Sequence, residues 1–134
     1  MPRLNARAQQ RVVETWRHKL EEDPKHILAD LVHNKTITNV QAQELVKRRV
    51  NVVEMLKIQR RAMSHKREAE STRDPSFYGL AGKLFADAAD HAMKAGLNSY
   101  AALFLNEAIN AKKVAGVPEE EIFVFKQTIK GLMD

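Results

Sequence analysis

Residues 38–70 read TNVQAQELVKRRVNVVEMLKIQRRAMSHKREAE, and this stretch decides the fold class. Its apolar residues recur at intervals of three and four, which is the period of one face of an α-helix. Thr38 and Gln41 fit the capping-box pattern, in which two side chains satisfy free backbone amides at a helix start. The first half carries an apolar stripe at Ala42, Leu45, Val46, Val50, Val53 and Leu56. We therefore expect one long helix over 39–70.

The second half of this helix is basic and poor in large apolar residues. Its apolar residues are reduced to Ala62, Met63 and Ala69. A helix without a continuous apolar stripe has little surface to bury against neighbours. The sequence thus predicts a protruding, exposed end to the helix and a boundary near residue 71.

The same helical period continues through the rest of the chain, with no convincing alternation of two. Capping residues, prolines and glycines divide the chain into helices over about 6–22, 24–33, 39–70, 75–95, 99–115 and from 118 onward. We expect an all-α bundle of about six helices, with one long basic central helix and a C-terminal three-helix unit. These helices form a basic section, 1–70, and a packing unit, 74–134, within one structural domain.

Composition excludes several classes of protein. The chain has no cysteine, which excludes a disulfide scaffold and a cysteine-based zinc site. It has no run of about 18 apolar residues, so no membrane span is expected. The opening residues lack the apolar core of a signal peptide. We expect a cytoplasmic protein without membrane contact.

Charge is unevenly distributed along the chain. Residues 1–70 carry 15 Lys/Arg and nine Asp/Glu, a net charge of +6, whereas residues 71–134 carry seven and eight, a net charge of −1. An electrostatic partner would therefore meet the first half. The candidate binding residues are the basic side chains of the central helix: Lys47, Arg48, Arg49, Lys57, Arg60, Arg61, Lys66 and Arg67.

These basic residues have three interpretations. They could form a solvated face that keeps the protein soluble, dock on an acidic protein surface, or track a phosphate backbone. Aromatic residues are absent between Trp16 and Phe77. Since bases stack on aromatic side chains, binding of nucleic acid here would rest on the backbone and carry little sequence preference.

Two further groups have the spacing of chemical sites. His26, Asp30 and His33 share one face of the helix over 24–33, a spacing that can bring metal ligands together. We interpret them as its polar side, because apolar residues occupy the other side. Asp87 and His91 stand four residues apart, but no nucleophile accompanies them. We expect no enzyme activity, metal or cofactor.

The stripe over 45–56 also approaches heptad spacing, so a homodimer seam is an alternative to packing within the monomer. The hypothesis that fits best is a small non-enzymatic helical interaction protein, an adaptor, inhibitor or assembly factor, that binds another macromolecule, most simply a protein. The alternative is a nucleic-acid-binding protein that uses the basic 47–67 helix on the phosphate backbone.

Overall fold

The computed structural model describes residues 4–18 and 24–133, with the backbone alone at 24–27 and 133. The described chain is all-α, as predicted, and contains seven helices where about six were expected. The helices are α1 (Ala6–His18), α2 (Pro24–His33), α3 (Asn39–Lys47), α4 (Arg49–Thr72), α5 (Pro75–Lys94), α6 (Asn98–Val114) and α7 (Glu119–Met133). No helix in the described ranges combines the length and apolar character that a bilayer crossing requires.

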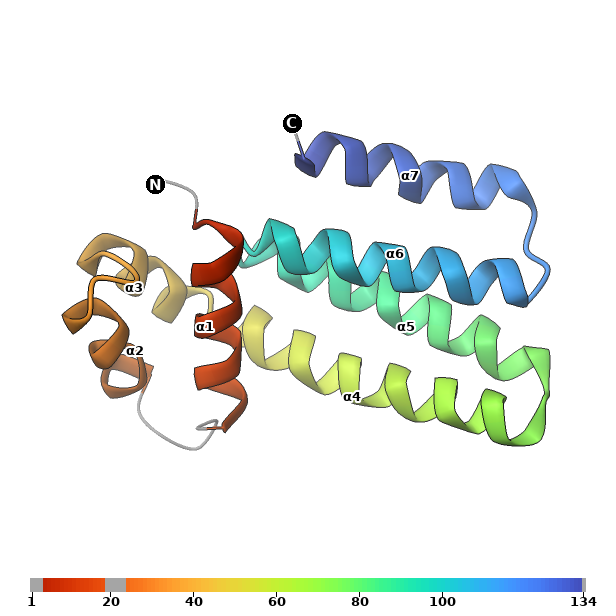
Figure 1. Cartoon of the computed structure of the whole chain (residues 1–134), viewed down its shortest axis with the longest axis horizontal. Helices are drawn as coiled ribbons and strands as arrows, with labels where there is room; N and C mark the ends of the chain where they lie inside the picture. Colours follow the sequence, from red (N-terminus) through yellow and green to blue (C-terminus); the bar gives the residue numbers. More distant parts are fainter. Residues whose placement is uncertain (1–3, 19–23, 134) are drawn as a thin grey trace.

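Four of the helices run side by side in alternating directions. Figure 1 shows α4, α5, α6 and α7 in that order, with α1 lying across one end of the array and α2 and α3 beyond α1. The expected C-terminal three-helix unit is present as α5–α7, and α4 extends it along α5. The two peripheral helices α2 and α3 are thus held away from the main array.

The predicted single helix over 39–70 is wrong, because the chain breaks at Arg48. This residue leaves helical geometry, with φ −100° and ψ 14°, and separates α3 from α4. Its backbone N–H still points at the carbonyls of residues 44–46. No proline or glycine marks the break, and Leu45 before it and Val52 after it are both fully buried. After the break α4 buries Val52, Met55 and Leu56, and the predicted stripe residue Val50 is left 71% exposed.

The expectation of a protruding basic end is also wrong. Ala62 and Ala69 are fully buried, because α4 lies along α5 for much of its length. Their small side chains bring the backbones close together, so little apolar bulk is needed to form the contact. The ring of His65 stacks on Phe77 at 6.3 Å between centroids. The last turns of α4 are therefore part of the packed array.

The core joins the two sections of the chain. Its largest fully buried side chains are Trp16 on α1, Phe85 on α5 and Phe104 on α6, and the rest is mainly alanine, leucine and valine. Gln9 is a buried polar link: its Nε2 donates to the Leu4 carbonyl at 2.8 Å, and its Oε1 accepts from the Ser99 N–H at 2.9 Å. Because both ends of the amide are satisfied, its burial costs little. This contact fixes the start of α1 against α6.

Candidate functional site

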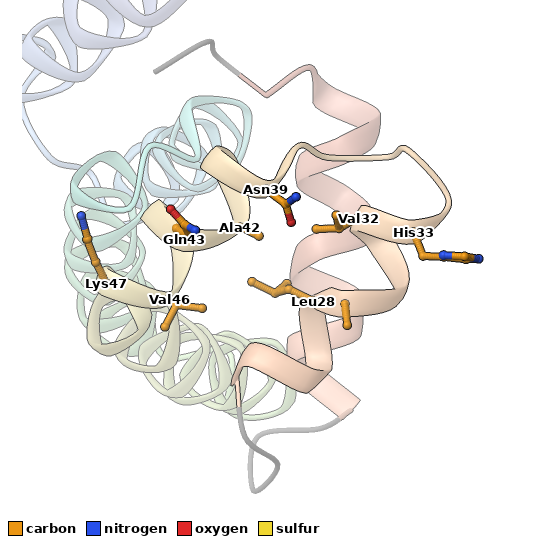
Figure 2. Close-up of a pocket in the computed structure, with 9 residues that line it drawn as sticks. Leu28, Val32, His33, Asn39, Ala42, Gln43, Val46 and Lys47 are labelled. Carbon is orange, nitrogen blue, oxygen red and sulfur yellow. The ribbon is translucent and has the colours of Figure 1, made fainter.

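An apolar groove lies between α2 and α3. It has a volume of about 760 Å³, and both helices contribute residues one turn apart. In Figure 2, Leu28 and Val32 extend from α2 toward α3. The lining consists of Leu28, Ala29, Val32 and His33 from α2 and of Asn39, Ala42, Gln43, Val46 and Lys47 from α3. An apolar channel between two helices is the shape that receives the apolar face of a third helix.

The turn between α2 and α3 sets the position of the groove walls. Ile37 is buried and anchors the turn in the core. The Thr38 side chain accepts a hydrogen bond from the Gln41 N–H at 3.1 Å, and the Thr38 N–H donates to Gln41 Oε1 at 2.8 Å. The predicted capping box is thus confirmed. It fixes where α3 starts, and hence which face of α3 meets the groove.

The rim of the groove is polar. His33 and Lys47 lie at its two outer edges, and Figure 2 shows their side chains pointing away from one another. No aspartate or glutamate is among the lining residues that the structure describes. Lys47 Nζ lies 3.4 Å from Glu44 Oε1, a pair on the exposed side of α3 that solvent screens. The groove therefore offers apolar contact at its centre and positive charge at one edge.

The eight candidate basic residues do not share one face, because the break at Arg48 divides them. Lys47 and Arg48 both lie near the carboxylate of Glu44, at 3.4 and 3.7 Å. Arg49 is half-buried at the start of α4. Two others have acidic partners: Lys57 lies 3.9 Å from Glu54 and Lys66 lies 3.1 Å from Glu107. The remaining three, Arg60, Arg61 and Arg67, are exposed.

An arginine from another helix lies close to Arg60 and Arg67. With Arg17 of α1 they surround a hollow of about 220 Å³, whose lining also includes Leu56 and Met63. Arg17 Nη2 donates to Gln59 Oε1 at 3.2 Å, which holds it beside α4. Sequence reasoning missed Arg17, because nothing in the spacing along α1 indicates which part of α4 it will meet.

His91 has a partner other than the one that its spacing in the sequence suggested. His91 Nδ1 lies 3.0 Å from Asn51 Oδ1, a contact that joins α5 to α4, so its ring bonds to an amide and not to Asp87. Asp30 and His33 are exposed on α2, and the side chain of His26 lies outside the described residues. Among the side chains that are described, no three groups are placed to hold a metal ion. The interpretation of this face as polar surface stays a prediction.

Tyr100 is the described side chain whose acidity the fold shifts clearly. It lies at the start of α6, where its ring is 6.0 Å from that of Phe104. Burial raises the pKa of the phenol, the nearby Arg17 guanidinium opposes this, and Glu14 adds to it. The net effect favours the neutral phenol. Tyr100 is thus a packing residue between α1 and α6 and not a candidate acid or base.

Known proteins add no identification. Comparison of the chain with protein-family models, with curated proteins and with solved structures gave no match.

Proposed function

We propose that this chain is a non-enzymatic helical binding protein whose α2–α3 groove receives the apolar face of a helix from a partner protein. The observation that carries the proposal is the 760 Å³ groove with its apolar lining. Leu28 is buried at its base, whereas Val32, Ala42 and Val46 remain half-exposed along it. Apolar residues aligned one turn apart on two helices match anchors spaced at three, four and seven residues on an incoming helix.

The charge of this region defines the partner's chemistry. Among the described residues the lining includes Lys47 and no carboxylate, and Lys47 and Arg48 both lie near the carboxylate of Glu44. The first 70 residues carry the positive excess of the chain. A helix with acidic residues beside its apolar stripe would complement the groove, whereas a basic one would be repelled. We therefore assign an acidic amphipathic helix as the occupant.

The proposal can be tested with two labelled synthetic helices that share one apolar stripe. One carries glutamate beside the stripe and the other carries lysine. Fluorescence anisotropy should show saturable binding of the acidic peptide and much weaker binding of the basic one. Ala29→Glu and Gln43→Glu place a negative charge in the groove lining, and both positions are exposed, so the fold should be retained. Each variant should weaken binding of the acidic peptide.

Gln127→Glu on α7 is the matched control, because it makes the same change at an exposed position outside the groove. It should leave the peptide affinity unchanged. Equal loss of affinity in Gln43→Glu and Gln127→Glu would show that net charge, and not the groove, decides binding. Absence of binding by either peptide would refute the proposal.

A second candidate function is binding of nucleic acid, and the arginines near α1 support it. Arg60, Arg61 and Arg67 form no ion pair with a carboxylate among the described residues, and Arg17 adds a fourth guanidinium from α1. Such a group could track phosphates through counterion release. Most of the other basic residues of 47–67 lie near acidic partners, so this surface is smaller than the sequence suggested. We therefore rank nucleic-acid binding second.

A salt titration distinguishes this candidate from the first. Retention of the protein on an oligonucleotide should fall steeply as salt rises. Replacing Arg60, Arg61 and Arg67 together by glutamate should abolish it. The control replaces Lys83, Lys113 and Lys130 by glutamate. These are exposed lysines of α5, α6 and α7, so the net charge changes by the same amount. An equal loss of retention in both triple variants would show that net charge alone causes binding. Absence of retention at low salt would exclude this function.

A further inference from the structure

A polar pocket lies where the start of α1 meets the turn after α2. Its volume is about 400 Å³, and it is separate from the groove, with which it shares no lining residue. Four of its residues come from the start of α1 and three from the turn. They are Asn5, Arg7, Ala8, Arg11, Asn34, Lys35 and Thr36.

Three cations surround this pocket. Arg7 and Arg11 stand one turn apart on α1 and Lys35 comes from the turn, while no aspartate or glutamate is among the described residues that line it. None of the three forms an ion pair within the described ranges. The first turn of α1 contains no acidic residue. Since the amino end of a helix carries partial positive charge, this end adds to the positive potential of the pocket.

Two asparagines leave their amide NH₂ groups available as donors. Asn5 Oδ1 accepts from the Ala8 N–H at 2.8 Å, and Asn34 Oδ1 accepts from the Thr36 N–H at 3.1 Å and from the Thr36 hydroxyl. With each oxygen occupied by backbone or hydroxyl donors, the nitrogen is the part of each amide left for a ligand. The pocket thus combines fixed positive charge with neutral donors, which is the set that a phosphate group recognises.

Lys35 occupies a backbone position that normally belongs to glycine. Its φ is 65°, and the N–H groups of Lys35 and Thr36 donate to the carbonyls of Val32 and Leu31. The same hydrogen-bond pattern closes α5 at Gly96 and α6 at Gly116, with φ of 78° and 79°. Glycine adopts this conformation without strain, and a residue with a Cβ does not. Among the described helix ends, α5 and α6 use glycine in this conformation, whereas Lys35 after α2 and Arg73 after α4, with φ of 59°, adopt it with a Cβ.

We propose that this pocket binds the phosphate group of a small phosphorylated molecule. Two guanidinium groups and one ammonium group supply charge, the two asparagine amides supply direction, and a volume of about 400 Å³ has room for a phosphate group. The site does not depend on the α2–α3 groove. It would let a small anion bind where α1 meets the turn after α2.

Isothermal titration calorimetry of the full chain with inorganic phosphate, pyrophosphate and a nucleoside monophosphate tests the proposal. We expect saturable binding of at least one of these probes, tighter for pyrophosphate than for phosphate. Arg7→Gln combined with Arg11→Gln should weaken that binding by roughly tenfold or more, because charge-assisted hydrogen bonds are lost. Arg73→Gln combined with Lys113→Gln removes two exposed positive charges outside the pocket and should leave it unchanged.

Lys35→Gly gives a second readout that a purely structural lysine would not show. It should raise the thermal midpoint of unfolding, because the strain is relieved, and at the same time weaken phosphate binding. An unchanged affinity in Lys35→Gly or in the Arg7/Arg11 double variant would overturn the proposal. So would absence of saturable binding by all three probes, including the case in which an oligonucleotide binds but pyrophosphate does not.

Discussion

The side chain of Lys112 on α6 passes directly over Gly82 on α5. A Cβ placed on Gly82 would lie 3.0 Å from Cγ of Lys112, 3.4 Å from the Ala108 carbonyl oxygen and 3.5 Å from Ala111 Cβ. The lysine ammonium then reaches the ring of Phe125 on α7, 5.7 Å from its centroid. This one crossing links three helices, and it depends on the missing side chain at position 82.

The two glycines of α5 should respond differently to alanine. A Cβ on Gly79 would meet no atom of a neighbouring helix or side chain within 4 Å, so Gly79→Ala should raise the free energy of unfolding by about 0.5–1 kcal/mol through helix propensity. Gly82→Ala gains the same propensity but crowds Lys112, so its net gain should be smaller or negative. Urea denaturation of both variants measures the difference. An equal gain at both positions would contradict the close crossing described above.

Much of this fold could be predicted from short-range signals. The capping box at Thr38, the cap and proline at Asp74–Pro75 and the helix-ending Gly96 and Gly116 all act within a few residues, so the sequence alone marks them. The break at Arg48 carries no such signal. Its cause is tertiary, because Leu45 and Val52 must reach different parts of the core, and single-sequence periodicity cannot show that.

The candidate sites were less accessible to sequence reasoning for the same reason. The basic residues of 47–67 were visible as a cluster in the sequence, but their acidic partners include Glu107 from a distant helix. The groove and the polar pocket each combine residues from two segments whose contact depends on how α1, α2 and α3 pack. The stripe behind the homodimer alternative is divided as well, because Val50 is 71% exposed whereas Leu45 and Leu56 are buried within the chain.

The capping box of α3 should have a measurable effect on stability. Thr38→Ala removes the side-chain acceptor for the Gln41 N–H and should lower the free energy of unfolding by about 1 kcal/mol. Thr38→Ser retains the hydroxyl and should stay close to the wild type. Urea denaturation distinguishes the two variants. A serine variant as unstable as the alanine variant would show that the methyl group, and not the cap, supplies the stability.

Tyr100 should make the protein sensitive to alkaline pH. Its pKa in the folded protein is raised above the ordinary value of 10.0, mainly by burial. A group whose pKa is higher in the folded state contributes stability below its unfolded pKa and loses it as pH rises through the folded pKa. Tyr100→Phe cannot ionise, so its stability relative to the wild type should improve as pH rises above about 10. Denaturation curves at neutral and alkaline pH measure the difference in stability between the variant and the wild type. A difference that does not change with pH would contradict this prediction.

The most direct test of peptide binding at the α2–α3 groove is a ¹H–¹⁵N correlation spectrum recorded during titration with the acidic amphipathic peptide. The backbone amides of Leu28, Val32, Ala42 and Val46 should shift progressively and reach saturation together, while those near the exposed Phe123 and Val124 of α7 stay in place. Shifts confined to α7 or to the arginines of α4, or none at all, would contradict the claim.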